Sequence, residues 1–369
     1  MHVFSDTDHR HMQRALDLAA RGAWTTRPNP MVGCVIAHGE EIVGEGWHQR
    51  AGGPHAEVFA LREAGERARG ATAYVTLEPC AHHGRTPPCV EALIQAGIAR
   101  VVAALRDPFA QVDGAGFEHL RAARISVESG LLQTPARELN RGFLSRIERG
   151  RPWLRIKLAM SLDGRTALAN GESKWITGEA ARADVQRWRA RAGALLTGSG
   201  TLLADDPRLT VRLPDADIAP VLRVALDRHL RTPAAAHFLD GQAPTLLFHA
   251  PDATPDARFA AVECEALPAA GLGLSLPAAL QRLAARGINE VQVEAGPILG
   301  GALFEQGLAD ELLLYIAPVL LGSDARPLLH LPALGDITDR WRLRVVEEGK
   351  LERDWWLLCR READGAGTP

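Results

Sequence analysis

Four residues in the first quarter of the chain have the types and the spacing of a catalytic zinc site. His55 and Glu57 are separated by one residue, Cys80 directly follows a proline, and Cys89 comes after eight intervening residues. One imidazole and two thiolates give three protein ligands, and a fourth tetrahedral position stays open for water, as in catalytic zinc sites. Glu57 is placed to transfer protons instead of binding the metal. The pattern therefore predicts one zinc ion per chain and metal-assisted hydrolysis.

The H-x-E … P-C … C pattern is typical of enzymes that hydrolyse an amino group from a pyrimidine or purine-like ring. A water polarised by zinc attacks the ring carbon that bears the amine. Glu57 would take a proton from this water, deliver it to the ring nitrogen and help ammonia leave, which requires a raised pKa in a water-poor pocket. A structural zinc site is the alternative. His82 or His83 could supply a fourth ligand to it, but three ligands and a water explain Glu57 better.

These residues need a scaffold, and the first 145 residues alternate helix and strand patterns that predict an α/β domain. His55 and Glu57 would open one helix, and Cys89 would lie in the first turn of another. Helix N-termini favour negative charge and therefore thiolates. We expect helices over 11–20, 55–67, 88–96 and 116–123, and strands over 32–36, 41–47, 71–77, 100–105 and 125–128.

A second α/β pattern follows an arginine-rich segment over 146–152, which we interpret as a linker. The length of 369 residues agrees with about two domains. We place them at 1–147 and 148–369. For the second domain we expect helices over 178–192, 276–286 and 303–306, strands over 153–159, 194–197, 221–226, 245–249, 290–294, 310–316 and 356–359, and an exposed loop over 213–219.

Composition excludes several classes of function. The net charge of −3 offers no basic footprint for nucleic acid, and no apolar run is long enough to span a bilayer. The N-terminus lacks the apolar core of a signal peptide, so we expect a cytoplasmic protein. Five cysteines in so long a chain do not form a disulfide framework. We expect Cys34, Cys264 and Cys359 to be buried free thiols.

Longer motifs around the zinc residues make the interpretation more specific. The segments 26–35, 46–48, 51–57 and 77–89 resemble the deaminase half of the bifunctional riboflavin-biosynthesis deaminase–reductase family, and the resemblance covers nearly all of the chain. It implies a cytidine-deaminase-like three-layer fold and, as substrate, a diaminopyrimidinone with a phosphoribosylamino group. Carried over position by position, it places Asn29, His48 and His82 on the base, and Arg85 and Thr86 near the ribose phosphate, which an arginine fork can bind bidentately.

One segment departs from that family. Its members usually have an Asp-Pro-Asn-Pro run where this chain has Asp107-Pro108-Phe109-Ala110. Phe109 cannot replace the hydrogen bonds of an amide. Either another group binds that edge of the substrate, or the affinity of the deaminase is altered.

The second half resembles the reductase half of the same family, through segments 157–166, 171–177, 201–212 and 294–302. The resemblance implies a dihydrofolate-reductase-like α/β fold and hydride transfer from NADPH, which opens a ribosyl group to a ribityl chain. Residues alone do not distinguish NADPH from NADH. The glycines of 294–302 follow a predicted strand, where main-chain N–H groups can approach a phosphate, although a plain turn would also account for them.

The reductase resemblance also implies site residues. Trp175 could equally belong to the core, Asp205 could belong to a bare turn, and the two arginines below could be ordinary surface charges. The residues implied to line the nicotinamide nucleotide are Ala159, Trp175, Thr201, Asp205, Gly296, Pro297, Ile298, Leu299, Gly300, Gly301 and Ala302. Those implied to hold the substrate are Ser173, Arg189, Leu209, Arg212 and Glu294, with the arginines suited to its phosphate.

Two other functions compete with a riboflavin-biosynthesis deaminase and reductase. A nucleoside or tRNA deaminase with an accessory domain is disfavoured by the wide cysteine spacing and the acidic net charge. A zinc-stapled binding module is disfavoured by Glu57 and by the second set of motifs. The expected partners are a small phosphorylated pyrimidine and a second copy of the chain, with neither nucleic acid nor a membrane.

Overall fold

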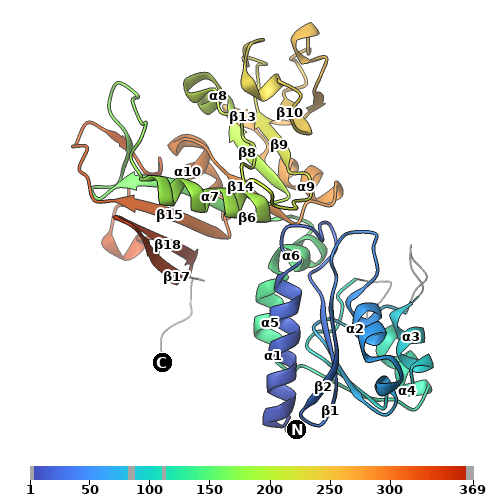
Figure 1. The fold of residues 1–369 in the computed structure, drawn as a ribbon. Helices are drawn as coiled ribbons and strands as arrows, with labels where there is room; N and C mark the ends of the chain where they lie inside the picture. Colours follow the sequence, from blue (N-terminus) through green and yellow to red (C-terminus); the bar gives the residue numbers. More distant parts are fainter. Residues whose placement is uncertain (1–3, 82–87, 110–113, 363–369) are drawn as a thin grey trace. The chain divides into compact units, whose positions relative to one another are not determined.

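The structure is a computed structural model, and it describes residues 4–81, 88–109 and 114–362 (Figure 1). The predicted sites His82, Arg85 and Thr86 lie outside these residues. The chain divides into two compact units. The first contains residues 1–150 and 217–219, and the second contains residues 151–216 and 220–369.

A five-stranded sheet forms the middle of the first unit, in the order β2-β1-β3-β4-β5. β1 pairs antiparallel with both β2 and β3, while β3, β4 and β5 run parallel. The strands are β1 (Gly33–His38), β2 (Glu41–Trp47), β3 (Thr72–Val75), β4 (Arg100–Ala103) and β5 (Ser126–Ser129), and the helices are α1 (Asp6–Ala20), α2 (Ala56–Ala64), the 3-10 turn η1 (Gly65–Ala68), α3 (Cys89–Gln95), α4 (Ala115–Ala122), α5 (Gln133–Leu139) and α6 (Arg141–Arg149).

Alternating side chains build two separate cores on the two faces of this sheet. Cys34 and Ile36 of β1 pack into one core together with residues of α2, α3 and α4. Val35 and Ala37 pack into the other core together with residues of α1, α5 and α6. The predicted three-layer arrangement is therefore confirmed.

Two predicted boundaries in the first unit are wrong. The expected linker over 146–152 is helical as far as Arg149, because Phe143, Leu144 and Ile147 give α6 an apolar face that packs in the core. Helix α1 begins at Asp6 and not near residue 11, because Ser5 and Asp8 form a capping box, with the Ser5 side chain accepting from the Asp8 amide.

A nine-stranded sheet forms the second unit, in the order β11-β10-β9-β8-β14-β6-β15-β18-β17. Its strands from β11 to β15 run parallel, and β18 and β17 add an antiparallel hairpin. These strands are β6 (Trp153–Ser161), β8 (Ala194–Gly198), β9 (Leu222–Leu226), β10 (Thr245–His249), β11 (Glu263–Ala266), β14 (Glu290–Val293), β15 (Glu311–Ala317), β17 (Leu343–Leu351) and β18 (Asp354–Arg361).

Helices and small pieces complete the second unit. Two large cores lie on opposite faces of its sheet, so the predicted α/β class is confirmed here as well. The glycine-rich turn after β14 already belongs to a helix that begins at Pro297, not at residue 303 as predicted. The other elements are α7 (Glu179–Arg191), α8 (Ser199–Asp205), α9 (Leu276–Ala285), α10 (Pro297–Glu305), the 3-10 turns η2 (His237–Leu239), η3 (Ala257–Phe259) and η4 (Ile337–Asp339), and the short strands β7 (Arg165–Ala167), β12 (Ala269–Ala270), β13 (Gly273–Leu274) and β16 (Arg326–Pro327).

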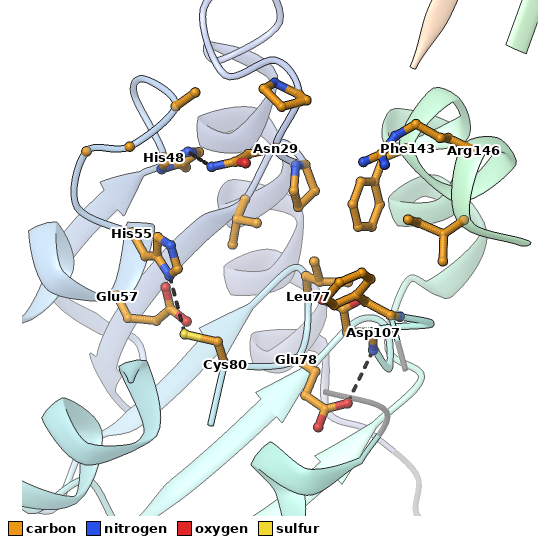
Figure 2. Close-up of a pocket in the computed structure, with 18 residues that line it drawn as sticks. Asn29, His48, His55, Glu57, Leu77, Glu78, Cys80, Asp107, Phe143 and Arg146 are labelled. Atoms are coloured by element: carbon orange, nitrogen blue, oxygen red, sulfur yellow. Dashed lines mark hydrogen bonds between the residues drawn. The ribbon is translucent and has the colours of Figure 1, made fainter. Parts of the chain in front are cut away.

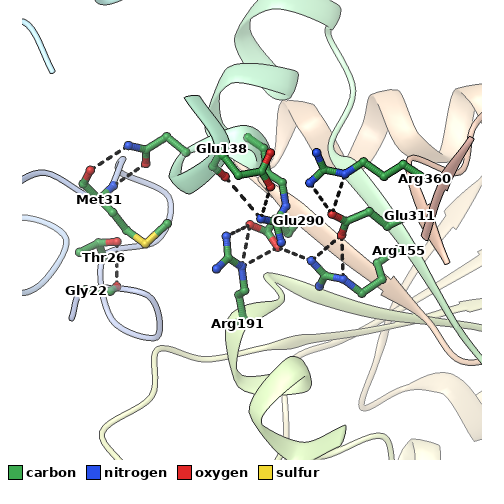
Figure 3. Close-up of polar contacts among 11 residues, drawn as sticks. Gly22, Thr26, Met31, Glu138, Arg155, Arg191, Glu290, Glu311 and Arg360 are labelled. Atoms are coloured by element: carbon green, nitrogen blue, oxygen red, sulfur yellow. Dashed lines mark hydrogen bonds and ion pairs between the residues drawn. The ribbon is translucent and has the colours of Figure 1, made fainter. Parts of the chain in front are cut away.

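A network of buried ions joins the middle strands of the second unit (Figure 3). Arg155 is almost fully buried and contacts Glu311 at 2.8 Å and Glu290 at 3.3 Å. Arg191 pairs with Glu290 at 3.1 Å, and Arg360 pairs with Glu311 at 2.8 Å. Each carboxylate therefore faces two guanidinium groups, which offsets the desolvation of the buried charges.

The five cysteines form no disulfide. Cys34 and Cys359 are buried as predicted, whereas Cys264 is only partly buried at the margin of a core. Among the described residues, none of the helices is both long and apolar enough to cross a membrane.

Candidate functional sites

Three elements of the first unit bring the predicted zinc ligands to one point. His55 is the N-cap residue of α2, Cys89 is the first residue of α3, and Cys80 follows β3. The His55 Nδ1 atom lies 3.1 Å from Cys89 Sγ and 3.5 Å from Cys80 Sγ. All three ligand atoms lie within 4.8 Å of one another.

This spacing fits a zinc ion. Bonds of about 2.1 Å to nitrogen and about 2.3 Å to sulfur place tetrahedral ligand atoms roughly 3.5 to 3.8 Å apart. Two thiolates and an imidazole are also the donor set that zinc prefers. The first amide of α3, on Cys89, donates to Cys80 Sγ at 3.4 Å, and hydrogen bonds from Cys89 and His55 lower the pKa of the Cys80 thiol. These contacts favour the anionic form of the Cys80 sulfur, while the hydrogen bond to Cys80 and burial raise the pKa of the Cys89 thiol.

Glu57 lies beside these ligands in the first turn of α2 and is only 2 % exposed. Its Oε2 atom has no hydrogen-bond partner among the described residues. Burial raises the pKa of the Glu57 carboxyl. A buried carboxylate oxygen without a partner, next to a metal-binding cluster, is placed to exchange protons with a molecule bound there.

A cavity of about 540 Å³ opens onto this cluster (Figure 2). That volume lies in the range of about 300 to 1,000 Å³ typical of small-molecule sites. Its described lining, besides His55, Glu57 and Cys80, consists of Pro28, Asn29, Pro30, Val32, His48, Ala51, Gly52, Gly53, Leu77, Glu78, Asp107, Phe109, Phe143, Arg146 and Ile147.

Asn29 and His48 face this cavity as a hydrogen-bonded pair. The Asn29 Nδ2 atom lies 3.1 Å from His48 Nε2, and His48 Nδ1 lies 3.0 Å from the carbonyl oxygen of Pro54. A carbonyl only accepts, so Nδ1 carries the proton and Nε2 accepts from the amide. Burial lowers the pKa of His48 and favours this neutral form. The contact with His48 thus uses the amide nitrogen of Asn29 and leaves the Oδ1 atom as an acceptor for a bound molecule.

Asn140 fixes the loop that carries Asn29, a role that the sequence did not indicate. The Met31 amide donates to Asn140 Oδ1 at 2.8 Å, and Asn140 Nδ2 donates to the Met31 carbonyl at 2.8 Å (Met31 in Figure 3). Asn140 is buried at the junction of α5 and α6. The two residues are 109 positions apart, and no local pattern reveals such a pair.

Glu78 is a second positioning residue that the sequence analysis missed. Its carboxylate accepts hydrogen bonds from the amides of Asp107, Gly114, Gly116 and Phe117, at 3.2, 3.1, 2.9 and 3.4 Å. It is buried directly before Pro79 and Cys80, and a charged residue at the end of a buried strand is the signal that could have identified it.

Phe109 lies in the segment that Glu78 anchors. Its side chain lines the cavity and is 38 % exposed, and its amide donates to Asp107 Oδ1 at 2.9 Å. The cavity wall at this position is therefore apolar.

The second unit pairs two of the predicted substrate residues with each other. Arg189 donates to both carboxylate oxygens of Glu294, at 2.6 and 2.7 Å, and to the Thr210 carbonyl at 2.9 Å. Burial alone would raise the pKa of Glu294, but Arg189 overrides this effect and holds it at about 2. Much of the hydrogen-bonding capacity of Arg189 is thus used inside the protein.

Lys157 belongs to the same charged group, although the sequence analysis did not select it. Burial lowers its pKa, while the charges of Glu294 and Arg189 act on it in opposite directions. Its ammonium lies 5.7 Å from the ring centre of Tyr315. A single lysine within the apolar strand pattern of β6 is the signal that could have indicated it.

The N-terminus of α10 fits a phosphate group. Gly296 is its N-cap, Pro297 has no N–H, and no side chain caps this helix, so the amides of Ile298 and Leu299 are the ones that can bind a ligand. The Gly296 amide donates to Thr201 Oγ1 at 3.2 Å, and a Cβ at Gly296 would meet no atom within 4 Å. Gly301 also permits close packing, because a Cβ there would lie 2.2 Å from the His330 carbonyl oxygen.

The other predicted reductase residues have varied surroundings. Trp175 is 69 % exposed, with the Arg182 guanidinium 4.7 Å from its ring centre, so the alternative of a core residue is wrong.

Leu209 is 2 % exposed and packs in a core. Ala159 lies on β6 and Asp205 ends α8. Burial lowers the pKa of Arg212, whose amide donates to Gln186. Ser173 is partly exposed in the loop before α7.

Comparison with known proteins identifies both halves. Residues 5–105 match the cytidine and deoxycytidylate deaminase zinc-binding region, and residues 152–352 match the RibD C-terminal domain. The riboflavin biosynthesis protein RibD of Escherichia coli is 50 % identical over 92 % of this chain and 95 % of its own length. The RibD of Haemophilus influenzae is 48 % identical over 94 % and 95 %.

Two solved structures share the whole architecture. RibD of Acinetobacter baumannii superposes with a TM-score of 0.90 at 44 % identity, covering 97 % of this chain and 99 % of that one. A diaminohydroxyphosphoribosylaminopyrimidine deaminase and 5-amino-6-(5-phosphoribosylamino)uracil reductase of Thermotoga maritima gives 0.84 at 32 % identity, covering 96 % and 99 %.

Proposed function

The chain belongs to the RibD family of bifunctional riboflavin biosynthesis enzymes, and from this premise we propose how its residues divide the two reactions. The enzyme is a zinc hydrolase and an NADP-dependent oxidoreductase. It deaminates 2,5-diamino-6-(5-phosphoribosylamino)pyrimidin-4-one and then reduces the ribosyl group of the product to ribityl. We assign deamination to residues 1–147 and reduction to residues 148–369.

Deamination uses the cavity of the first unit. His55, Cys80 and Cys89 hold the zinc ion, which when bound lowers the pKa of water and supplies a nucleophile near neutral pH. Glu57 would accept one proton of the attacking water on Oε2 and pass it to the ring nitrogen, and would then take the proton of the added hydroxyl and deliver it to the departing amine. Asn29 and His48 orient the base through the open Oδ1 acceptor.

The remaining deaminase residues are proposed from the resemblance. We place His82 on the base, and Arg85 and Thr86 near the ribose phosphate.

Reduction uses the groups around the ends of β6, β8 and β14. NADPH supplies the hydride when bound. We propose that the open amides of α10 bind a phosphate of this cofactor, with Thr201 and Asp205 beside it and Trp175 near the nicotinamide. The charged group of Arg189, Glu294 and Lys157 holds the polar substrate.

Further residues of the reductase site rest on the resemblance alone. We propose Ser173, Leu209 and Arg212 for the substrate. For the nicotinamide nucleotide we propose Ala159, Pro297, Ile298, Leu299, Gly300, Gly301 and Ala302.

The observation that carries the deaminase assignment is the unpartnered Glu57 Oε2 atom beside three converging zinc ligands. The test is a metal analysis combined with an ammonia-release assay on the diaminopyrimidinone ribotide. We expect one zinc per chain, release of ammonia, and NADPH oxidation that begins only after deamination. Cytidine and tRNA serve as competing substrates, and faster deamination of either one would favour the alternative function.

We also propose a cytoplasmic location and self-association. Five cysteines without a disulfide suit a reducing compartment. Exposed apolar side chains, such as Ile337 and Val345 near the edge strand β17, suit contact with a second copy. Light scattering after gel filtration tests self-association, and a monomer at micromolar concentration would exclude it.

A further inference from the structure

The described lining of the deaminase cavity holds several acidic groups and one arginine. Glu57 and Cys80 lie at the zinc cluster, and Glu78 and Asp107 belong to the lining as well. The substrate of the proposed function carries a phosphate with a charge of about −1.5 to −2 at neutral pH. Like charges repel strongly in a cavity of low dielectric constant. A phosphate is therefore bound most favourably away from the buried carboxylate of Glu57, where a wall of the lining supplies positive charge.

Helix α6 provides such a wall. Phe143, Arg146 and Ile147 line the cavity at positions i, i+3 and i+4, which share one face of a helix. Figure 2 shows Phe143 and Arg146 on the opposite side of the cavity from His55 and Glu57, with the Arg146 side chain extending from its helix toward the cavity. Within the described lining, Arg146 is the one lysine or arginine.

The guanidinium of Arg146 lies against the ring of Phe143 and keeps its positive charge. Its Cζ atom lies 5.7 Å from the ring centre of Phe143, and the residue is partly buried. Burial lowers the pKa of Arg146, yet arginine keeps its proton in proteins. A partly dehydrated guanidinium offers a planar fork that matches phosphate oxygens.

We propose that Arg146 binds the 5-phosphate of the ribosyl group and thereby makes the deaminase selective for the ribotide over the riboside. This inference rests on the proposed function. Arg146 approaches from α6, whereas Arg85 and Thr86, which the family resemblance implies near the same phosphate, belong to the segment between the two cysteines. Arg146 is thus a separate specificity determinant on a helix.

A structural role for Arg146 is the competing explanation, since cations in the last turn of a helix stabilise it. Arg149 lies in the same last turn and outside the cavity lining, with its side chain bonded to Ser145 Oγ at 3.0 Å. Arg149→Met is therefore a matched control for the loss of one positive charge from α6.

The experiment compares ribotide and dephosphorylated riboside as deaminase substrates for the full-length zinc enzyme. We expect Arg146→Met to raise KM for the ribotide on the order of tenfold to hundredfold, as for a lost charge-assisted hydrogen bond. KM for the riboside, kcat, zinc content and the reductase activity should stay unchanged. Arg146→Lys should retain part of the preference, and Arg149→Met all of it.

Equal effects of Arg146→Met on both substrates, or no effect on either, would overturn the inference. The proposed function fails separately, if wild-type enzyme deaminates neither substrate. If Arg146→Met does not fold, the Arg146→Lys variant and its inhibition by inorganic phosphate test the inference instead. Phosphate should inhibit wild-type deamination of the riboside and inhibit the lysine variant less, and equal inhibition of both would contradict the assignment.

Discussion

The first unit gathers its chemical groups as side chains around one point, whereas the second distributes them over the ends of several strands. His55, Cys80 and Cys89 converge within 4.8 Å. In the second unit, the candidate contacts of NADPH include main-chain amides at the start of α10, and two of the five implied substrate residues bind each other. A metal requires particular side chains, while a nucleotide can be held largely by main chain and shape.

This difference explains why the two sites differ in how readily a sequence reveals them. A zinc ligand set can be recognised from three residue types and their spacing. A phosphate site made from open amides needs only a strand, a turn without side-chain caps and a helix, and many unrelated turns share that pattern. We expect the two units to respond differently to substitution, and the following changes test that expectation.

The largest effect is expected from Glu57→Gln. An amide cannot carry a proton from water to the ring nitrogen, and general acid–base catalysis contributes about a hundredfold to ten-thousandfold. Ammonia release should fall by that factor while zinc content stays at one per chain. Reduction of supplied deaminated substrate should persist at the wild-type rate, and its loss would disprove the division of labour between the units.

Glu294→Gln should lower the stability and the reductase activity of the second unit and leave the deaminase activity of the first unit unchanged. It leaves the buried Arg189 without its carboxylate, and breaking such a pair destabilises by about 3 to 5 kcal/mol. Because the pKa of Glu294 is lowered to about 2, the ion pair contributes fully above pH 4.5 and its contribution is lost as pH falls toward 2. Thermal unfolding of both proteins between pH 7 and pH 2 measures this.

The difference in melting temperature between wild type and Glu294→Gln should shrink through that acid range, and NADPH oxidation by the variant should be impaired at neutral pH. Ammonia release should be unaffected. A difference in melting temperature that stays the same from pH 7 to pH 2 would show that the ionised Glu294–Arg189 pair is not the source of the lost stability.

Asn140→Ala should have an intermediate effect on the first unit. It removes two hydrogen bonds to Met31, together worth about 1 to 3 kcal/mol, and frees the loop that carries Asn29. KM for the ribotide should rise several-fold to tenfold with zinc retained. Asn140→Asp keeps the acceptor for the Met31 amide, so its KM should lie between those of wild type and Asn140→Ala. An aspartate variant with a KM as high as that of the alanine variant would contradict the role given to Asn140.

The smallest effect is expected from Phe109→Asn. An added amide in the cavity wall can form one hydrogen bond to the substrate, which corresponds to about a twofold to tenfold decrease in KM. The zinc chemistry and kcat should remain within twofold. Phe109→Leu is the control for lost ring contacts. An asparagine variant with unchanged KM would show that another group already binds this edge of the substrate.

The sequence predicted most strands and the converging zinc ligands because these follow local patterns. It missed α5 and α6 entirely and interpreted the last turn of α6 as part of a linker, although Phe143 and Ile147 of α6 have helical spacing. It also missed β17, an edge strand whose exposed Glu347 and Glu348 interrupt any apolar alternation.

The supporting contacts could not be predicted. Asn140 and Met31 lie 109 positions apart, and Glu78 reaches amides up to 39 positions away. Such pairs depend on the assembled layers and not on any neighbouring residue. Trp175 shows the same limit, since only the structure distinguishes an exposed ring from a core ring.

The hydrogen bonds of Glu78 to the amides of Asp107, Gly114, Gly116 and Phe117 have a consequence for which substitutions the protein tolerates. The four amides are main-chain N–H groups, which nineteen of the twenty amino acids supply. These contacts are therefore independent of most side chains at the four positions and of the side chain at Phe109. We expect a substitution of Phe109 to change the cavity wall and leave the Glu78 contacts intact. Proline at the four bound positions, and any side chain at Gly116, whose Cβ would lie 2.1 Å from the Pro79 carbonyl oxygen, are the changes that selection must remove.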